Sequence, residues 1–165
     1  MLSSAIHKWT MSMYVAWTDG AYRSTTDTGG YASVITKNKK IITILYQGYR
    51  HTTNNRCELM GVLETLRYFK EPTRIHIVSD SQYVVSSIVN KHVHKWFEEK
   101  DFTKKNLDIW FEILDLLSFH TVTFEWVKGH ADNEWNNKAD LYAQHAATCM
   151  NLPTDLKHEW NNFQN

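Results

Sequence analysis

The fold is decided by residues 12–50, which read SMYVAWTDGAYRSTTDTGGYASVITKNKKIITILYQGYR. This stretch contains three runs of β-forming residues, at 12–18, 30–36 and 40–50. The first run leads directly into Asp19-Gly20, so we expect Asp19 at the carboxyl end of a strand and a turn over 21–30. A short polar link separates the other two runs. The pattern predicts three antiparallel strands, joined as a hairpin or meander.

Helical periodicity begins after this stretch. Apolar residues at 59, 62, 63, 66 and 69 follow the 3.6-residue repeat, which predicts a helix over 55–70 with Thr53 or Asn54 as its cap. Further along the chain we expect a strand at 74–79, a helix over 81–93, an amphipathic helix near 107–117, a strand at 120–127 and a helix over 135–148. This order predicts an α/β fold with a five-stranded mixed sheet, three antiparallel strands followed by two parallel additions, flanked by helices.

Length and composition fit one globular domain. The chain has 165 residues, of which 42% are hydrophobic and 22% charged. Its two cysteines show no CxxC spacing, which disfavours a disulfide framework or zinc knuckle and fits a reducing compartment. We find neither a signal-peptide pattern nor a membrane-spanning run, and therefore expect a cytoplasmic protein without membrane contact. We divide the chain into an N-terminal extension (1–11), a domain (12–148) and a polar C-terminal tail (149–165).

Two aspartates stand where predicted strands end. Asp19 and Asp80 are both flanked by small or hydroxyl residues, and the carboxyl ends of strands in open α/β sheets are where ligands bind. Two carboxylates at one sheet edge repel each other unless a cation lies between them, and Mg²⁺ prefers such oxygen ligands. The alternative is that each Asp caps the turn or helix that follows it.

Three more residues extend this acidic set. Glu58 lies in the first turn of the helix predicted over 55–70, directly before its apolar stripe, and Asp140 follows Ala139 on the inner face of the last helix. Both can therefore border the core. His130, in a glycine-containing loop ten residues before Asp140, is either a proton carrier near neutral pH or an ordinary surface histidine.

Five strings along the chain resemble the successive motifs of the type 1 ribonuclease H family. They are WTDGA (17–21), TTNNRCELMG (52–61), VSDSQYV (78–84), WVKGHAD (126–132) and NNKADLYA (136–143). The resemblance covers roughly residues 12–148, in the family's order and spacing. It implies a ribonuclease H-like fold and a metal-dependent endonuclease. Such an enzyme hydrolyses the RNA strand of an RNA–DNA hybrid and leaves 3′-hydroxyl and 5′-phosphate ends.

The resemblance also implies roles for individual residues. Asp19, Glu58, Asp80 and Asp140 match the family's metal-binding carboxylates, and His130 matches its loop histidine. Two Mg²⁺ ions, with Mn²⁺ as a substitute, would activate the attacking water and stabilise the leaving oxygen. Asn54, Asn55, Gln82 and Glu58 itself match residues that contact 2′-hydroxyls or base edges, and Thr53 matches a contact to a DNA phosphate.

Residues 91–105 correspond to the family's basic protrusion. Trp96 can stack there on a deoxyribose, or it can anchor the protrusion to the body. The two Asn residues have an alternative role as helix caps. Two departures from the family pattern stand out. The turn AYRSTTDT replaces a Gly/Pro-rich loop, and at Arg50-His51 the position of the arginine that the family has beside its phosphate pocket is shifted.

The net charge of zero, from 18 basic and 18 acidic residues, is the sum of regions that differ in their local charge. Residues 28–57 include five basic side chains and no acid, and we expect this stretch to meet phosphate. Subtracting the four proposed metal ligands leaves 18 basic against 14 acidic residues. The expected partner is an RNA–DNA hybrid, and the expected enzyme is a monomer.

Two other hypotheses compete with this one. One is a nuclease of the same fold that acts on other substrates, such as an integrase or junction resolvase. TTNNR argues against it because, in the family, those residues read 2′-hydroxyls. The other is a catalytically silent hybrid-binding module, which would have no physical need to keep four like charges together.

Overall fold

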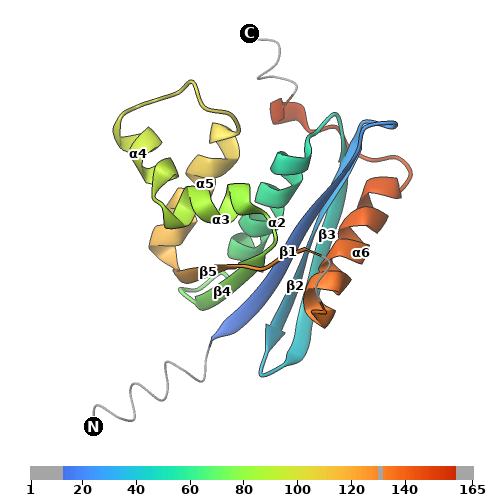
Figure 1. The fold of residues 1–165 in the computed structure, drawn as a ribbon, viewed down its shortest axis with the longest axis horizontal. Coiled ribbons are helices and arrows are strands. Elements are labelled where there is room, and N and C mark those ends of the chain that lie inside the picture. Colours follow the sequence, from blue (N-terminus) through green and yellow to red (C-terminus); the bar gives the residue numbers. More distant parts are fainter. Residues whose placement is uncertain (1–12, 130–131, 159–165) are drawn as a thin grey trace.

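A five-stranded mixed sheet runs through the molecule in the order β3-β2-β1-β4-β5 (Figure 1). The structure is a computed structural model that describes residues 13–129 and 132–158. The strands are β1 (Tyr14–Arg23), β2 (Thr28–Lys37), β3 (Lys40–Arg50), β4 (Arg74–Ser79) and β5 (Thr121–Trp126). The first three pair antiparallel, β4 pairs parallel with β1, and β5 pairs parallel with β4. The predicted sheet is therefore confirmed.

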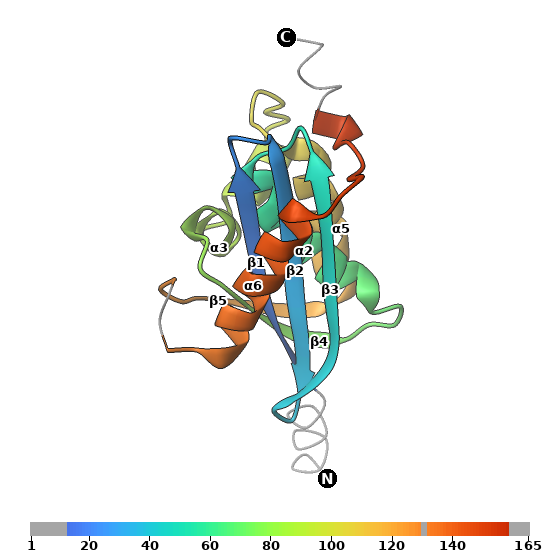
Figure 2. The ribbon, with the colours of Figure 1, turned by 90° about the vertical axis from the view of Figure 1, so that its right-hand side faces the viewer.

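Helices cover both faces of this sheet. They are α2 (Asn54–Tyr68), α3 (Gln82–Val89), α4 (His92–Glu98), α5 (Leu107–Phe119) and α6 (Glu134–Thr148). In Figure 1, α6 lies on one side of the sheet and the other four lie on the opposite side; Figure 2 shows α6 crossing in front of β1–β3. The main core fills the space beneath α2 and α5, where Leu59, Leu66, Ile77, Trp110 and Ile113 are almost completely buried.

Small residues let α6 approach the sheet closely. Its inner face is made of Ala139, Ala143, Ala146 and Ala147, all buried. A Cβ added at Gly48 of β3 would lie 2.1 Å from the backbone oxygen of Ala146. Backbone therefore packs against backbone here, which leaves little space for a larger residue.

Strand β1 is longer than expected. We placed Asp19 at a strand end and a turn over 21–30, but β1 continues to Arg23 because β2 offers it partners, from Asp19↔Ala32 to Arg23↔Thr28. The parallel pairing with β4 does stop earlier, at Thr18↔Ser79. Asp19 therefore lies just beyond the end of the β1–β4 pairing, while the β1–β2 pairing continues past it.

The helix predicted over 81–93 is also wrong as one element. It divides into α3 and α4 at Lys91, whose φ of 56° is left-handed. At the end of α3, the N–H of Asn90 donates to the carbonyl of Ser86 (3.0 Å), and the N–H of Lys91 donates to the carbonyl of Ile88 (2.9 Å). The chain then turns and forms α4 over His92–Glu98, most of which lies beyond the predicted helix.

The C-terminal segment, defined here as residues 149–158, packs on β3. Leu152 and Asp155 are buried. The N–H of Arg50 donates to the carbonyl of Pro153 (2.8 Å), and the N–H of Asp155 donates to the carbonyl of Arg50 (2.9 Å). Part of the expected polar tail is therefore attached to the edge of the sheet. Among the helices of the described ranges, none is long and apolar enough to cross a membrane.

Candidate active site

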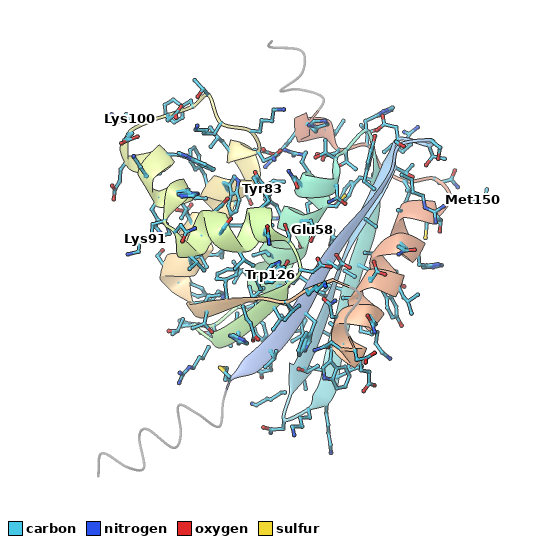
Figure 3. All side chains as sticks on the ribbon, viewed as in Figure 1. Glu58, Tyr83, Lys91, Lys100, Trp126 and Met150 are labelled. Carbon is cyan, nitrogen blue, oxygen red and sulfur yellow. The ribbon has the colours of Figure 1, made fainter. Side chains whose placement is uncertain are left out.

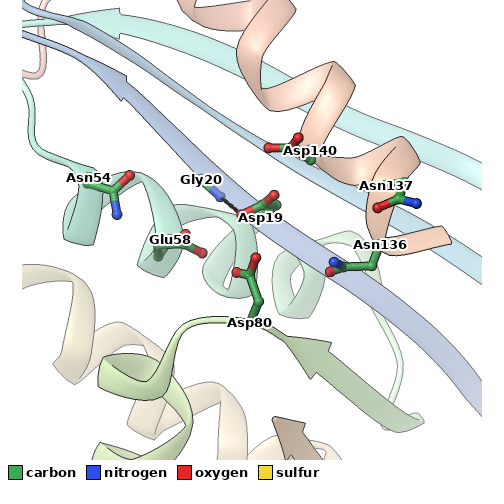
Figure 4. A pocket seen from close by; sticks show the side chains of 8 residues that line it. All are labelled: Asp19, Gly20, Asn54, Glu58, Asp80, Asn136, Asn137 and Asp140. Carbon is green, nitrogen blue, oxygen red and sulfur yellow. Dashed lines mark hydrogen bonds between the residues drawn. The ribbon is translucent and has the colours of Figure 1, made fainter. Parts of the chain in front are cut away.

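The strand register brings three carboxylates together. Asp19 and Asp80 each follow the last parallel pair of β1 and β4, so they emerge side by side from neighbouring strands. Glu58 joins them from the second turn of α2. One carboxylate oxygen from each of the three residues lies within 4.8 Å of the other two. Figure 3 shows Glu58 directed inward beside β1, and Figure 4 shows the carboxylates converging.

Gly20 permits this arrangement. A Cβ at this position would lie 2.5 Å from the backbone nitrogen of Glu58 and 2.8 Å from the carbonyl carbon of Cys57. The absence of a side chain therefore lets α2 rest directly on β1. The N–H of Gly20 also donates to Oδ1 of Asp19 (2.8 Å), which orients that carboxylate.

Asp140 contributes from the opposite side of the sheet edge. It projects from α6, and its carboxylate accepts hydrogen bonds from Nε2 of Gln144 (3.0 and 3.2 Å). It lines the same pocket as the other three acids. The full lining is Asp19, Gly20, Asn54, Glu58, Asp80, Asn136, Asn137 and Asp140. All four carboxylates predicted as metal ligands therefore surround one pocket (Figure 4).

Crowded like charges dominate the electrostatics of this pocket. Burial, followed by the charges of Asp80 and Asp140, raises the pKa of Asp19 to about 8. Burial, followed by the charges of Asp19 and Asp80, also raises the pKa of Glu58 well above its usual value. Without a cation, Asp19 therefore retains its proton near neutral pH, and Glu58 loses its proton at a higher pH than an ordinary glutamate does.

The donor set fits a hard divalent cation. Among the described residues, the lining contains four carboxylates and three asparagines but no lysine or arginine. Oε2 of Glu58 and Oδ1 of Asn136 are both buried and lack a hydrogen-bond partner among the described residues. Buried acceptors are normally paired, so unpaired oxygens at a carboxylate cluster favour an ion as the missing partner.

The other predicted residues lie at the ends of helices near this pocket. Asn54 and Asn55 are exposed at the start of α2, and Gln82 is exposed at the start of α3. Asn54 lines the pocket, whereas Asn55 and Gln82 do not. Thr53, not an asparagine, caps α2 by accepting a hydrogen bond from the N–H of Arg56 (3.2 Å).

Trp96 of α4 contacts the body of the protein. Its ring packs edge-to-face with Trp110 (centroids 6.5 Å apart) and is half-buried against the core. These contacts match the anchoring role. The aromatic side chains that α4 and the following loop expose are Phe97 and Phe102. Figure 3 places Lys91 and Lys100 on the outer side of this protrusion. His130 lies outside the described residues.

Two functional candidates escaped the sequence interpretation. Asn136 is 2% exposed and reaches into the pocket one turn before Asp140. The sequence could have indicated Asn136, because it lies four residues before Asp140 and residues with this i, i+4 spacing share one face of a helix. The second is Asp155, for which no local pattern exists. Arg56, which we counted among residues that meet phosphate, is 1% exposed and hydrogen-bonded to Asp108 and Asp155.

The two departures from the family pattern contact each other. Nδ1 of His51 lies 2.8 Å from Oδ2 of Asp27, and the hydroxyl of Tyr22 donates to Oδ1 of the same carboxylate (2.8 Å). The β1–β2 turn is thereby joined to the residue that stands next to the TTNNR segment.

Gly20→Ala is expected to disturb the carboxylate cluster and weaken Mg²⁺ binding at least about tenfold, since the added methyl group would push Glu58 away from Asp19. We also expect about 1–3 kcal/mol of destabilisation from the overlap. Calorimetric titration with Mg²⁺ and thermal unfolding measure the two effects.

Gly48→Ala is the matched control, because its methyl group also collides with a helix backbone but does so away from the pocket. It should lower stability and leave Mg²⁺ affinity unchanged. Equal Mg²⁺ affinity in the two variants would contradict the role assigned to Gly20.

Comparison with known proteins agrees with this geometry. The family model described as RNase H matches residues 11–148. The chain is 36% identical over 148 residues to the ribonuclease H of Trichodesmium erythraeum, which spans 87% of this chain and 94% of the relative. It is 39% identical over 136 residues to the ribonuclease H of Chlorobium luteolum, and this match covers 79% of this chain and 92% of the relative.

Among solved structures, the chain is similar to LC9-RNase H1, described as a type 1 RNase H with the type 2 active-site motif. The TM-score is 0.73 at 25% identity, and the match covers 83% of this chain and 72% of the other. The sequence match, the fold and the carboxylate pocket all agree, and the chain belongs to the ribonuclease H family of enzymes.

Proposed function

We propose that this enzyme is a metal-dependent endonuclease that hydrolyses the RNA strand of RNA–DNA hybrids, leaving 3′-hydroxyl and 5′-phosphate ends. The observation that carries the proposal is the convergence of Asp19, Glu58, Asp80 and Asp140 on one pocket. No lysine, serine or cysteine lines that pocket to act as a protein nucleophile, within the part of the chain that the structure describes. A carboxylate pocket of this kind is suited to holding cations that activate water.

The four carboxylates would hold two Mg²⁺ ions, or Mn²⁺ as a substitute. When bound, the ions supply a nucleophilic hydroxide and stabilise the leaving oxygen. The chain's own residues perform the remaining tasks. Gly20 N–H orients the carboxylate of Asp19, and the pocket-lining Asn136 offers a neutral oxygen. His130 is proposed to carry protons, so its removal should slow the reaction without abolishing it.

Recognition of the hybrid is assigned to the helix starts around the pocket. Asn54, Asn55 and Gln82 present exposed amides that can donate to or accept from 2′-hydroxyls and base edges. Thr53 is proposed to contact a phosphate of the DNA strand. The lysines of residues 91–105 add positive charge beside this surface, so binding should weaken as salt is added.

A substrate panel tests the proposal. Labelled RNA–DNA hybrid, duplex DNA and single-stranded RNA are incubated with the protein, with and without Mg²⁺. We expect cleavage of the hybrid RNA alone, only with the metal, and with 5′-phosphate products. The physical reason is that the 2′-hydroxyl distinguishes the RNA strand and the carboxylates are inert without cations.

The Asp19→Asn variant serves as the control for a contaminating nuclease. Cutting of duplex DNA, or hybrid cleavage that persists in EDTA, would refute the proposal. Binding of the hybrid without any cleavage would instead support the silent binding module. The monomeric state and cytoplasmic location stay predictions.

A further inference from the structure

One carboxylate holds both ends of the TTNNR segment, residues 52–56. Oδ2 of Asp155 accepts hydrogen bonds from the hydroxyl of Thr52 (2.9 Å) and from Nε of Arg56 (2.7 Å). Its Oδ1 accepts from Nη2 of Arg56 (3.2 Å). Thr52, Arg56 and Asp155 are 3%, 1% and 6% exposed, so water does not compete for these bonds.

A second carboxylate completes the fixation of Arg56. Asp108, in the first turn of α5, accepts from Nη1 (3.0 Å) and Nη2 (2.8 Å) of the guanidinium. This fork-to-fork geometry is directional and admits little rotation. Burial opposes ionisation of Asp108, but the hydrogen bonds and charge of Arg56 lower its pKa below the usual value. Arg56 therefore joins the start of α2 to both α5 and the C-terminal segment.

The residues between the two fixed ends face solvent. Thr53 is half-buried, and Asn54 and Asn55 are exposed. Exposed amides on a loosely held loop would lose conformational entropy when they bind a ligand, whereas amides held in place beforehand lose little. The segment that supplies Asp155 is itself attached, since its backbone pairs with Arg50 at the end of β3.

We propose that Asp155 is a positioning residue for hybrid recognition, through which the C-terminal segment holds Thr53, Asn54 and Asn55 in the conformation that binds substrate. This inference rests on the proposed function. It makes the C-terminal segment a support for the substrate site. Glu58 has its own support in the contact between Gly20 and α2, so loss of Asp155 affects binding more than turnover.

Steady-state cleavage of hybrid by two variants tests the proposal. Asp155→Ala is expected to raise KM roughly tenfold with kcat within about twofold, the size associated with losing hydrogen bonds to a charged group. Thr52→Val removes one hydroxyl donor at nearly constant volume and should raise KM about threefold. Amide hydrogen exchange over residues 53–56 should quicken in both variants.

Ile75→Ala is the control for general loss of stability. Ile75 is fully buried at the other end of β4 from Asp80, and its truncation lowers stability without touching residues 52–56. Its KM should match that of the wild-type protein. A KM that rises equally in Ile75→Ala would overturn the positioning role.

The remaining outcomes are equally decisive. Wild-type protein that cleaves no hybrid overturns the proposed function and this inference with it. Cleavage by the wild-type protein together with an unchanged KM in a folded Asp155→Ala overturns only the inference. If Asp155→Ala does not fold, Thr52→Val alone decides: an unchanged KM and unchanged exchange over 53–56 refute the positioning role.

Discussion

Asp19→Asn is expected to lower kcat for hybrid hydrolysis by at least about 10³-fold, which corresponds to about 4 kcal/mol of transition-state stabilisation. Asp19 is central to the cluster: its carboxylate lies among those of Glu58 and Asp80, and Asp140 lines the same pocket. An amide keeps the size of the side chain and an oxygen that can accept from Gly20 N–H. It lacks the charge that attracts a divalent cation.

The same substitution is expected to stabilise the metal-free protein. Asp19 is 4% exposed, and burial beside Asp80 and Asp140 makes its ionised form unfavourable. Removing that charge relieves the repulsion, so the melting temperature in EDTA at pH 8 should rise while activity disappears. Single-turnover cleavage and thermal unfolding measure the two effects on one sample.

Asp115→Asn provides the matched control. Asp115 is exposed on α5, away from the pocket lining, so its substitution should change neither activity nor the melting temperature appreciably. An Asp19→Asn protein that keeps a tenth or more of wild-type activity would contradict the metal-ligand role. One that melts lower than the wild-type protein would contradict the electrostatic account.

The second large effect is a pH dependence of stability that Mg²⁺ reverses. The pKa of Asp19 is about 8 in the folded protein against 3.8 ordinarily, and that of Glu58 is also raised. The folded protein therefore binds protons that the unfolded chain has released. Stability from these groups is fully present below about pH 4 and falls as the pH rises toward 8, by about 1.4 kcal/mol per pH unit for each retained proton.

Bound Mg²⁺ replaces those protons. We expect the metal to raise the free energy of unfolding by about 2.7 kcal/mol at a concentration one hundred times its Kd, and by more at pH 8 than at pH 5. Urea unfolding at several pH values, in EDTA and in saturating Mg²⁺, measures the difference. In EDTA, the free energy of unfolding of Asp19→Asn should depend less steeply on pH than that of the wild-type protein. Equal slopes would show that groups other than Asp19 cause the pH dependence.

Much of the fold was predictable because its signals are local. Alternating and 3.6-residue apolar patterns follow directly from the geometry of strands and helices, and they predicted the presence and order of the five strands and of the helices α2, α5 and α6, although not the full length of β1. The acids were predictable for a related reason. Asp80 follows a short apolar strand, and Glu58 and Asp140 border apolar helix faces, so their approach to one pocket required only the correct sheet order.

The errors arose where distant partners decide the structure. β1 extends past Asp19 because β2 pairs with it there, which no property of residues 19–23 alone indicates. From the sequence, Arg56 is expected to be a surface cation. In the structure it is buried and hydrogen-bonded to Asp108 and Asp155, which lie 52 and 99 positions further along the chain. A cation's environment depends on which charges the fold brings to it.

The sequence by itself determined the sheet, the helices α2, α5 and α6, and the identity of the four acids that line one pocket, since apolar periodicity and the residues that follow strands are local properties of the chain. Only the tertiary structure decided how closely those acids approach, which oxygens stay unpaired, and that the C-terminal segment holds the TTNNR residues through Asp155. The physical reason is that proton affinity, cation binding and side-chain fixation depend on distances and burial, and these arise from contacts between residues far apart in the chain.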